Sequence, residues 1–111
     1  MTFEPFDVVV VPFPFSDRRA SKRRPALIVS SAHFNEAHDQ AILAMITTAA
    51  GEWPSDVALR DWKEAGLNAP CKVRFKLFTL DHTLILRRIG ALSKQDGAAI
   101  KDALRRFLTQ D

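Results

Sequence analysis

Residues 6–15, FDVVVVPFPF, form a run of β-branched and aromatic side chains near the start of the chain. Such a run is typical of a buried strand. Pro12 and Pro14 have no N–H to donate to a sheet, so we expect the strand to end, bulge or become an edge at the prolines. PALIVSS at residues 25–31 predicts a second strand. The beginning of the chain is therefore expected to be β-structure.

The segment from Arg18 to Arg24, which lies between these two runs, carries five cations and no anion. The cations are Arg18, Arg19, Lys22, Arg23 and Arg24. The whole chain has a net charge of +3 and would be net acidic without this segment. Such a loop is a candidate phosphate-binding site, because affinity for nucleic acids comes largely from neutralised phosphates. The alternative is a solvated loop that keeps the protein soluble.

The middle of the chain predicts a third strand and a short helix. AILAMITT at residues 41–48 is either a strand or a helix, and its β-branched end favours the strand. LRDWKEA at residues 59–65 predicts a short helix, with Gly66 in the position of a C-terminal cap.

Charged and apolar side chains alternate strictly over residues 72–78, which is the pattern of a half-buried strand. The expected solvent face carries Lys72, Arg74 and Lys76, and the expected inner face carries Val73, Phe75 and Leu77. Asp81 and His82 are expected in a hairpin turn before a strand at residues 84–89, which Gly90 closes. The strand at residues 72–78 would thus expose a row of three cations.

A helix is predicted near the end of the chain. Ser93 and Asp96 form a start that resembles a capping box, with Asp in place of the usual Glu. Beyond them, five apolar side chains fall on one helical face: Ile100, Ala103, Leu104, Phe107 and Leu108. We therefore expect one domain over residues 1–111 with an α+β fold that is mainly β, a small twisted sheet or partly open barrel with a C-terminal helix packed on it.

Several classes of protein are disfavoured by what the sequence lacks. The one cysteine, Cys71, cannot form an intrachain disulfide, which suits a reducing cytosol. The N-terminus lacks the basic start of a signal peptide, and no apolar run is long enough to span a membrane, so a cytoplasmic protein is expected. Metal-hydrolase and glycine-rich phosphate-loop motifs are missing, and no metal or cofactor is predicted. His33 and His38 could share a metal ion, but ordinary surface histidines are the favoured interpretation.

Charge-stabilised chemistry on a phosphodiester is the option that these residues support. RNA carries its own nucleophile, the 2′-OH, so a ribonuclease has to align that oxygen, move protons and stabilise the charge on phosphorus. A guanidinium can bind two phosphoryl oxygens together. Arg24 is the favoured arginine, because Pro25 restricts its backbone to extended conformations. Lys22 and Arg23 are expected to attract phosphate.

Thr47 and Thr48 end the third apolar run, where one hydroxyl must face inward or toward a cleft. From the sequence alone they are either ordinary strand threonines or hydroxyl donors to a substrate. A ribonuclease without a metal ion could combine such a donor with one positioned arginine.

The stretch DVVVVPFPFSDRRASKRRPALIVSS resembles the opening of the MazF/PemK toxins of bacterial toxin–antitoxin modules. MITTA at residues 45–49 resembles the second catalytic segment of that family. FTLDHTLILRRIGALSKQD at residues 78–96 resembles its late hairpin and the start of its last helix. The resemblance covers nearly the whole chain in the same order.

The resemblance implies a small SH3-like β-barrel of the CcdB/PemK type, with a short inserted helix and a C-terminal helix, usually as a homodimer. It also implies a metal-independent endoribonuclease that cuts single-stranded mRNA at short sequences and leaves 2′,3′-cyclic phosphate and 5′-hydroxyl ends, so that growth stops. A cognate acidic antitoxin would neutralise it. By position, the family's catalytic arginine falls on Arg24 and its catalytic threonine on Thr47. The residues expected to contact RNA are Arg18, Arg19, Lys22, Arg23, Thr48, Arg74 and Lys76.

The strand at residues 72–78 departs from some members of the family, which carry an arginine and, two residues later, an acid. Val73 and Phe75 stand at those positions, so no proton-transfer role is carried over. This gap motivates a second hypothesis, a binding module that holds RNA or a protein without cutting, as the gyrase poisons of related fold do. A third hypothesis is a structural barrel whose arginines only keep it soluble.

Overall fold

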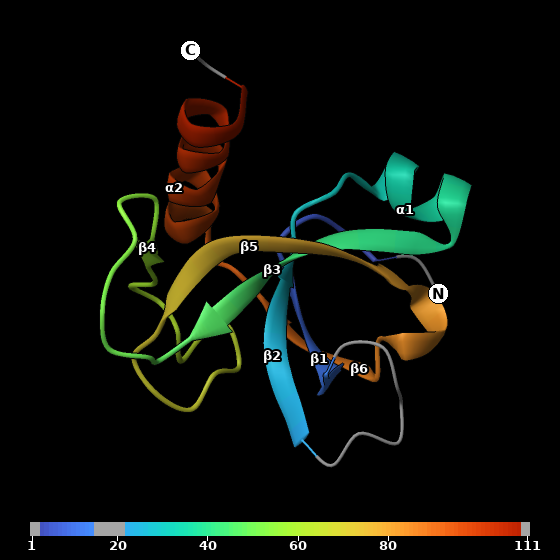
Figure 1. Ribbon diagram of the computed structural model, residues 1–111, viewed down its shortest axis with the longest axis horizontal. Coiled ribbons are helices and arrows are strands. Elements are labelled where there is room, and N and C mark those ends of the chain that lie inside the picture. The colour runs from blue at the N-terminus through green and yellow to red at the C-terminus, as the bar shows by residue number, and fades with distance from the viewer. Residues whose placement is uncertain (1–2, 15–21, 110–111) are drawn as a thin grey trace.

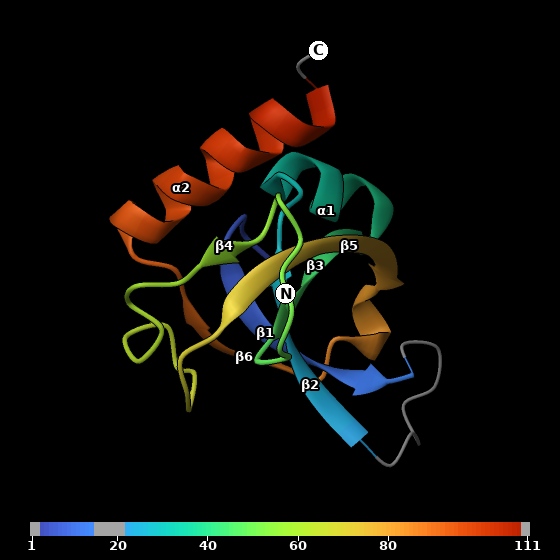
Figure 2. The same ribbon diagram turned by 60° about the vertical axis from the view of Figure 1, so that its left-hand side comes forward.

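The computed structural model describes residues 3–14 and 22–109, which form a curled antiparallel sheet with two helices (Figure 1). The strands are β1 (Asp7–Phe13), β2 (Lys22–Ile28), β3 (Gln40–Thr47), β4 (Val57–Ala58), β5 (Lys72–Asp81) and β6 (Arg87–Ala91). The sheet has the strand order β4-β5-β3-β2-β1-β6. The helices are α1 (Ala32–His38) and α2 (Lys94–Leu104). The expected α+β fold, a small barrel-like sheet with a helix near its C-terminal end, is confirmed (Figure 2).

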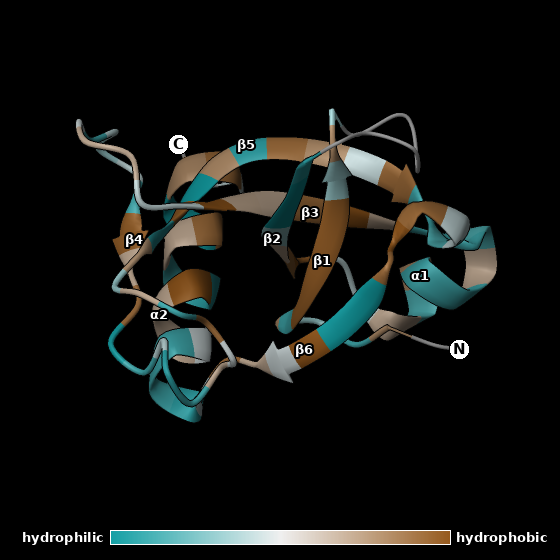
Figure 3. Ribbon diagram, turned by 90° about the horizontal axis from the view of Figure 1, so that it is seen from below, coloured by the Kyte–Doolittle hydropathy of each residue, from teal (hydrophilic) through white to brown (hydrophobic). Residues whose placement is uncertain are grey.

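Strand β1 is buried on both faces of the sheet, which explains why its sequence is continuously apolar instead of alternating. Val9 packs with Ile28 in a core cluster on one face. Val8 packs on the other face in a second cluster, together with Ile100 of α2. Figure 3 shows the hydrophobic colour along most of β1. The helix α2 is therefore needed to complete the burial of the sheet.

Pro12 lies where β1 has a neighbour on one side only. Strand β2 pairs with β1 up to the partners Phe13 and Lys22, whereas β6 pairs with β1 only as far as Val10. Beyond Val10, β1 is an edge on the β6 side, and a residue without an N–H is tolerated there. The expectation that the strand becomes an edge at the prolines is confirmed.

The helix α1 forms between the second and third predicted strands, where the sequence analysis predicted neither a helix nor a strand. Ser31 caps it, with its Oγ accepting a hydrogen bond from the Phe34 N–H at 3.1 Å. Asn35 is fully buried, and its Nδ2 donates to the carbonyl oxygen of Phe3 at 2.8 Å. This bond ties α1 to the start of the chain. The capping serine was the local signal for the helix.

The short helix predicted at residues 59–65 is wrong, because this segment folds as turns. Ala65 N–H donates to the Asp61 carbonyl oxygen at 3.1 Å, which gives a single helical turn and no more. The carboxylate of Asp96 accepts the backbone N–H groups of Arg60 and Asp61 at 3.0 and 2.8 Å. A side chain from α2 thus fixes the entry to the segment. Gly66 does end the turn, with a φ of 89°.

Strand β5 is longer than predicted, and its inner face changes along its length. Val73 faces the core as expected, but Leu77 is 39% exposed and Leu80 is buried instead. The pairing with β3 is irregular between Leu43 and Met45, where β5 has extra residues. Val73 and Leu80 belong to core clusters on opposite faces of the sheet, so the buried face changes along β5 while the alternation itself continues. The predicted inward position of Leu77 is therefore wrong.

The predicted hairpin after Asp81 is also wrong, because β5 and β6 are not paired with each other. Strand β5 pairs with β3 and β4, and β6 pairs with β1. A 3-10 turn over His82–Leu84 leads the chain from β5 to β6, at the opposite edge of the curled sheet. Gly90 lies within β6 instead of closing it.

The predicted start of α2 is confirmed, because the Asp96 N–H donates to Ser93 Oγ at 3.2 Å. Ile100 and Ala103 of the expected apolar face are buried. Phe107 and Leu108 lie in the π-helical turn Arg105–Thr109 and are 45% and 49% exposed. The apolar stripe thus reaches beyond the part of the helix that packs on the sheet.

Candidate functional site

A cavity of about 790 Å³ opens at the start of β2 and the end of β3. Its walls come from four parts of the chain: β1 and the first half of β2, the end of β3 with the residues that follow it, the segment 66–71, and β6. Arg23, Arg24, Thr47 and Thr48, all predicted to act on RNA, line this cavity. The structure therefore brings together side chains that lie more than 20 residues apart in the sequence.

Arg24 is positioned by its strand and by an aromatic ring. It pairs with Val11 of β1, and its guanidinium carbon lies 5.0 Å from the centroid of the Phe13 ring. This cation–π contact restrains the side chain while leaving its N–H groups for a ligand. Pro25 follows on the strand and is half-buried in the cavity wall. The side chain of Arg24 is itself exposed.

Thr47 ends β3, and it lines the same cavity as Arg24. The pairing of β2 with β3 ends at Ala26 and Met45. Arg24 and Thr47 each lie two residues beyond this last pair. The Thr47 Oγ1 accepts a hydrogen bond from the Ala49 N–H at 3.0 Å. A hydroxyl that accepts in this way keeps its own proton for another acceptor. Arg24 and Thr47 can therefore both donate to one bound group.

The described lining of the cavity is cationic. It carries the guanidinium groups of Arg23, Arg24 and Arg87, and it includes no Asp, Glu or His. Cys71 also lines the cavity, and burial, with the charge of Asp96, raises the pKa of its thiol above the ordinary 9.0. The cavity is therefore suited to a negatively charged ligand, with the thiol in its neutral form at pH 7.

The segment 66–69 forms one wall and is fixed by close backbone contact with β6. A Cβ on Gly66 would overlap the carbonyl oxygen of Ile89, and a Cβ on Gly90 would overlap the carbonyl oxygen of Ala65. Two glycines thus let the backbones approach each other. This wall brings Asn68 to the cavity, a residue that the sequence analysis did not single out.

Arg87 was also missed by the sequence analysis. It lies on β6, where it pairs with Val10 of β1, and its side chain reaches the cavity. The signal in the sequence was the Arg87-Arg88 pair, which interrupts the apolar run LILRRI. Arg88 is used differently, because its Nε donates to Asp7 Oδ1 at 2.9 Å.

Arg74 lies outside this cavity and is not part of an open cationic face. Its Nε and a terminal nitrogen donate to the two carboxylate oxygens of Asp56 at 3.1 and 2.8 Å. Its side chain is only 13% exposed. The hydrogen bonds from Arg74 hold the pKa of the Asp56 carboxyl below its ordinary 3.8, against the opposing effect of burial.

The expected row of three exposed cations on β5 is therefore only partly correct. Lys72 is also half-buried, and its Nζ donates to the Gly51 carbonyl oxygen at 2.5 Å. Lys76 is exposed, as predicted. Arg74 and Lys72 hold the loop between β3 and β4 in place, a use that their alternation does not reveal.

The remaining predicted residues fall in three places. Lys22 is exposed at the start of β2, opposite Phe13. Arg18 and Arg19 lie outside the described residues. His33 and His38 are both exposed on α1. Among residues 3–14 and 22–109, no group of three His, Cys, Asp or Glu side chains is placed to hold a metal ion, and no helix in that range is long and apolar enough to cross a membrane.

Comparison with known proteins gives one family and one fold. The model of the PemK-like, MazF-like toxins of type II toxin–antitoxin systems matches residues 4–108. No curated protein sequence matches the chain significantly. Solved structures of the same fold do match, at sequence identities of about one in five.

Three of these structures illustrate the likeness. A chain of the MazE–MazF complex of Deinococcus radiodurans has a TM-score of 0.76 and 18% identity, over 100% of this chain and 99% of that chain. A mycobacterial endoribonuclease in complex with its cognate antitoxin has a TM-score of 0.77 and 19% identity, over 98% and 97%. The Mycobacterium tuberculosis toxin MazF-mt6 has a TM-score of 0.74 and 22% identity, over 95% and 98%.

Proposed function

The chain belongs to the PemK-like, MazF-like toxins of type II toxin–antitoxin systems, and we propose that it is an endoribonuclease that cleaves single-stranded mRNA without a metal ion. The observation that carries this proposal is the placement of Arg24 and Thr47 on one cavity whose described charged lining is entirely cationic. Solved structures of the same fold include proteins named as endoribonucleases. The cavity offers two of the groups that phosphodiester cleavage by a 2′-OH uses: a fixed guanidinium and a hydroxyl donor.

In the proposed reaction, the 2′-oxygen of the substrate forms a bond to the adjacent phosphorus, and the bond from phosphorus to the 5′-oxygen breaks. The 2′-OH loses its proton, and the departing 5′-oxygen gains one. The products are a 2′,3′-cyclic phosphate and a 5′-hydroxyl. Arg24 donates to the non-bridging phosphoryl oxygens, whose negative charge grows in the transition state. Thr47 donates to the same group and aligns it for in-line attack.

The other cations have a separate role in this proposal. Lys22 and Arg23, together with Arg18 and Arg19, attract the RNA backbone to the mouth of the cavity, and Thr48 and Lys76 extend the contact surface. Arg74 contributes through the loop that it fixes. Binding of RNA should therefore weaken as salt concentration rises, because each neutralised phosphate releases counterions.

We also propose partners and a place of action. An acidic antitoxin segment suits the guanidinium-lined cavity, because it would occupy the phosphate positions with carboxylates. Antitoxin complexes are named among the structures of the same fold. A homodimer and a cytoplasmic location, where mRNA is translated, complete the proposal.

The test is cleavage of a mixed-sequence single-stranded RNA in excess EDTA. Arg24→Ala and Thr47→Val should each lower the cleavage rate by about 10²–10³-fold, the loss found when a donor to a developing oxyanion is removed. Arg105→Ala and Thr79→Val are matched controls, since both residues are exposed and neither lines the cavity. Fragments should carry cyclic-phosphate ends. Cleavage that stops in EDTA and returns with Mg²⁺ would contradict the proposal.

One observation favours a second candidate, a binding module without catalysis. The described lining of the cavity offers neither a carboxylate nor an imidazole to accept the 2′-OH proton. A toxin of this kind would hold RNA, or inhibit a protein target such as gyrase, and leave RNA intact. Intact RNA in the assay above, with retained and salt-sensitive binding to the parent protein, would establish this candidate.

A further inference from the structure

Trp53 is a large aromatic side chain that is exposed but fixed. Its exposed fraction is 40%. The backbone N–H of Trp53 donates to Asp56 Oδ2 at 2.9 Å, and its backbone carbonyl oxygen accepts the Asp56 N–H at 3.0 Å. These two bonds close a turn in the loop between β3 and β4. The turn sets the position of the indole before any ligand binds.

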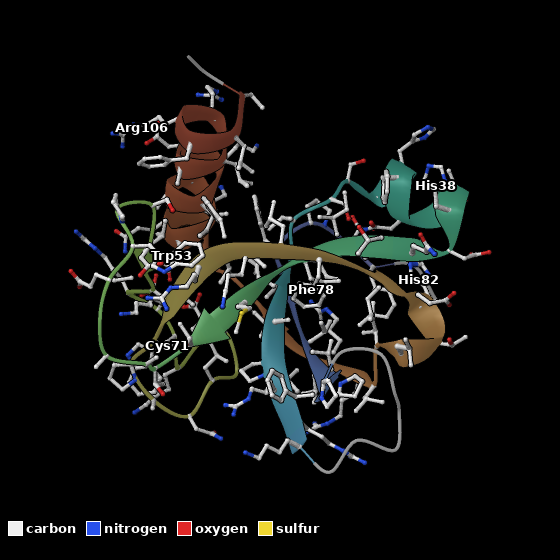
Figure 4. The ribbon with its side chains drawn as sticks, in the orientation of Figure 1. His38, Trp53, Cys71, Phe78, His82 and Arg106 are labelled. Atoms are coloured by element: carbon white, nitrogen blue, oxygen red, sulfur yellow. The ribbon has the colours of Figure 1, made fainter. Side chains whose placement is uncertain are left out.

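Two cations hold the indole from the side of the sheet. The guanidinium carbon of Arg74 lies 5.1 Å from the centroid of the Trp53 ring, and the Nζ of Lys76 lies 5.9 Å from it. Both side chains come from β5, two residues apart, so they approach the ring from the same strand. Figure 4 shows Trp53 beside this strand. Cation–π attraction of this kind fixes the plane of the ring.

The indole lies close to the cavity that holds Arg24. Thr47 and Lys72 are partners across β3 and β5. Thr47 lines the large cavity, whereas Lys72 lines a second hollow of about 410 Å³ together with Trp53. One cross-strand pair therefore connects the large cavity with the hollow that Trp53 lines.

We propose that Trp53, supported by Arg74 and Lys76, is a stacking subsite for the base of a nucleotide that flanks the scissile phosphate. This inference rests on the proposed function and adds a residue that takes part in substrate binding. A preset aromatic plane beside cations is the combination by which proteins hold single-stranded nucleic acids, since every base has a face that can stack. The exposed ammonium of Lys76 is available to the phosphate of the same nucleotide.

The chemistry of the site favours a base over an acidic peptide. A carboxylate would use the cations and leave the indole without a partner. A base uses the ring, and its phosphate uses the ammonium. Protein docking at Trp53 is therefore the alternative that the experiment must distinguish.

The experiment measures the binding of a 2′-O-methyl oligonucleotide, which keeps the bases and phosphates of RNA but has no 2′-OH and cannot be cut. Trp53→Leu should raise the dissociation constant of this oligonucleotide about tenfold, which is within the range for the loss of one stacked base. Trp53→Phe should recover most of the loss, because it restores an aromatic face. Leu77→Ala is the control. It changes an exposed apolar residue of β5, and the variant should bind the oligonucleotide as the parent does.

A scan with single abasic positions makes the test specific. One abasic position should weaken binding to the parent and have no further effect in Trp53→Leu, which identifies the stacked base. Equal affinity of the parent and Trp53→Leu would overturn the inference, whatever the outcome of the cleavage assay. Loss of a dimer in Trp53→Leu, or an acidic peptide that binds through Trp53 in place of the oligonucleotide, would overturn it in favour of a protein interface. If the parent binds no oligonucleotide, the proposed function and the subsite both fail.

Discussion

Arg74 and Asp56 form a pair with two parallel hydrogen bonds, 3.1 and 2.8 Å long, between strand β5 and the loop that precedes β4. The Asp56 side chain is 7% exposed, and it also accepts the backbone N–H of Trp53. One carboxylate thus connects the strand to the loop that carries the exposed indole. A charged pair with this geometry and this burial contributes more to stability than an open surface pair does.

Asp56→Asn should lower the melting temperature by several degrees at pH 7, and the difference from the parent should shrink in acid. The pKa of the folded Asp56 carboxyl lies below its ordinary value of 3.8. The stability that the pair provides is therefore complete above that value and is lost as the pH falls through the lower, folded value. Thermal unfolding between pH 3 and pH 7 measures this.

The matched control is Asp102→Asn, which removes a pair 3.8 Å long whose two side chains are about 60% exposed. Its melting temperature should be close to that of the parent at every pH, because exposed pairs contribute little. A difference between Asp56→Asn and the parent that is unchanged at pH 3 would show that the carboxylate charge is not what stabilises the loop.

Asp96→Ala should reduce the free energy of unfolding by roughly 2–4 kcal/mol, because it leaves two partly buried backbone N–H groups without their acceptor. Asp96 is 1% exposed and accepts from Arg60 and Asp61. Urea unfolding measures the loss. Glu64→Ala, at an exposed position of the same segment, is the control and should change the free energy by less than about 0.5 kcal/mol. A loss in Asp96→Ala no larger than that of the control would show that water replaces the carboxylate.

Gly90→Ala should destabilise the protein by more than about 2 kcal/mol, because its Cβ would overlap a backbone oxygen that cannot move independently. Gly97 provides an internal comparison. A Cβ there would lie 3.4 Å from the nearest atom of Phe6, an ordinary contact, and alanine is the better helix former in α2. Gly97→Ala should therefore be neutral or stabilising by up to about 1 kcal/mol. Equal effects of the two substitutions in chemical unfolding would contradict the close approach at Gly90.

The sequence predicted correctly the elements that neighbouring residues determine. It failed where the conformation depends on a contact with a residue far away in the sequence. The β-branched runs of β1, β2 and β3 and the Ser93 cap of α2 are local, and all four were found. The segment 59–65 has a helical pattern, but the carboxylate that fixes it comes from α2, about 35 residues later in the chain. Helix propensity depends on the local sequence and does not include such a contact.

The site shows the same division. Arg24 was singled out because a proline follows it, which is a local restraint. Arg74 looked like a surface cation, because its alternation with apolar residues contains no sign of Asp56, 18 residues away. Arg87 reaches the cavity only because β6 pairs with β1 and not with β5, a topology that the adjacent strands suggested incorrectly.

Cys71 should react slowly with iodoacetamide at pH 8, and RNA should slow it further. The thiolate is the reacting form, and the pKa of this thiol is raised above 9.0 by burial and by the charge of Asp96. Alkylation should therefore accelerate with pH beyond that value. Because Cys71 lines the cavity, an uncleavable oligonucleotide should protect it. Mass spectrometry of the labelled protein measures the alkylation rate as a function of pH and with the oligonucleotide present. The alkylation rate of a free cysteine in a short peptide serves as the reference for an unprotected thiol.

The rate of cleavage should rise with pH without the plateau that a titrating base of the protein would produce. The described lining of the cavity contains no carboxylate or imidazole, and guanidinium groups keep their protons throughout the accessible range. The proton of the 2′-OH then passes to solvent, so the single-turnover rate should rise with pH between about 6 and 9 without reaching a plateau. Arg24→Ala should shift this line downward without changing its slope, because the arginine stabilises charge and accepts no proton. A plateau below pH 7 in the parent would show that an acid or histidine outside the described lining acts as the base.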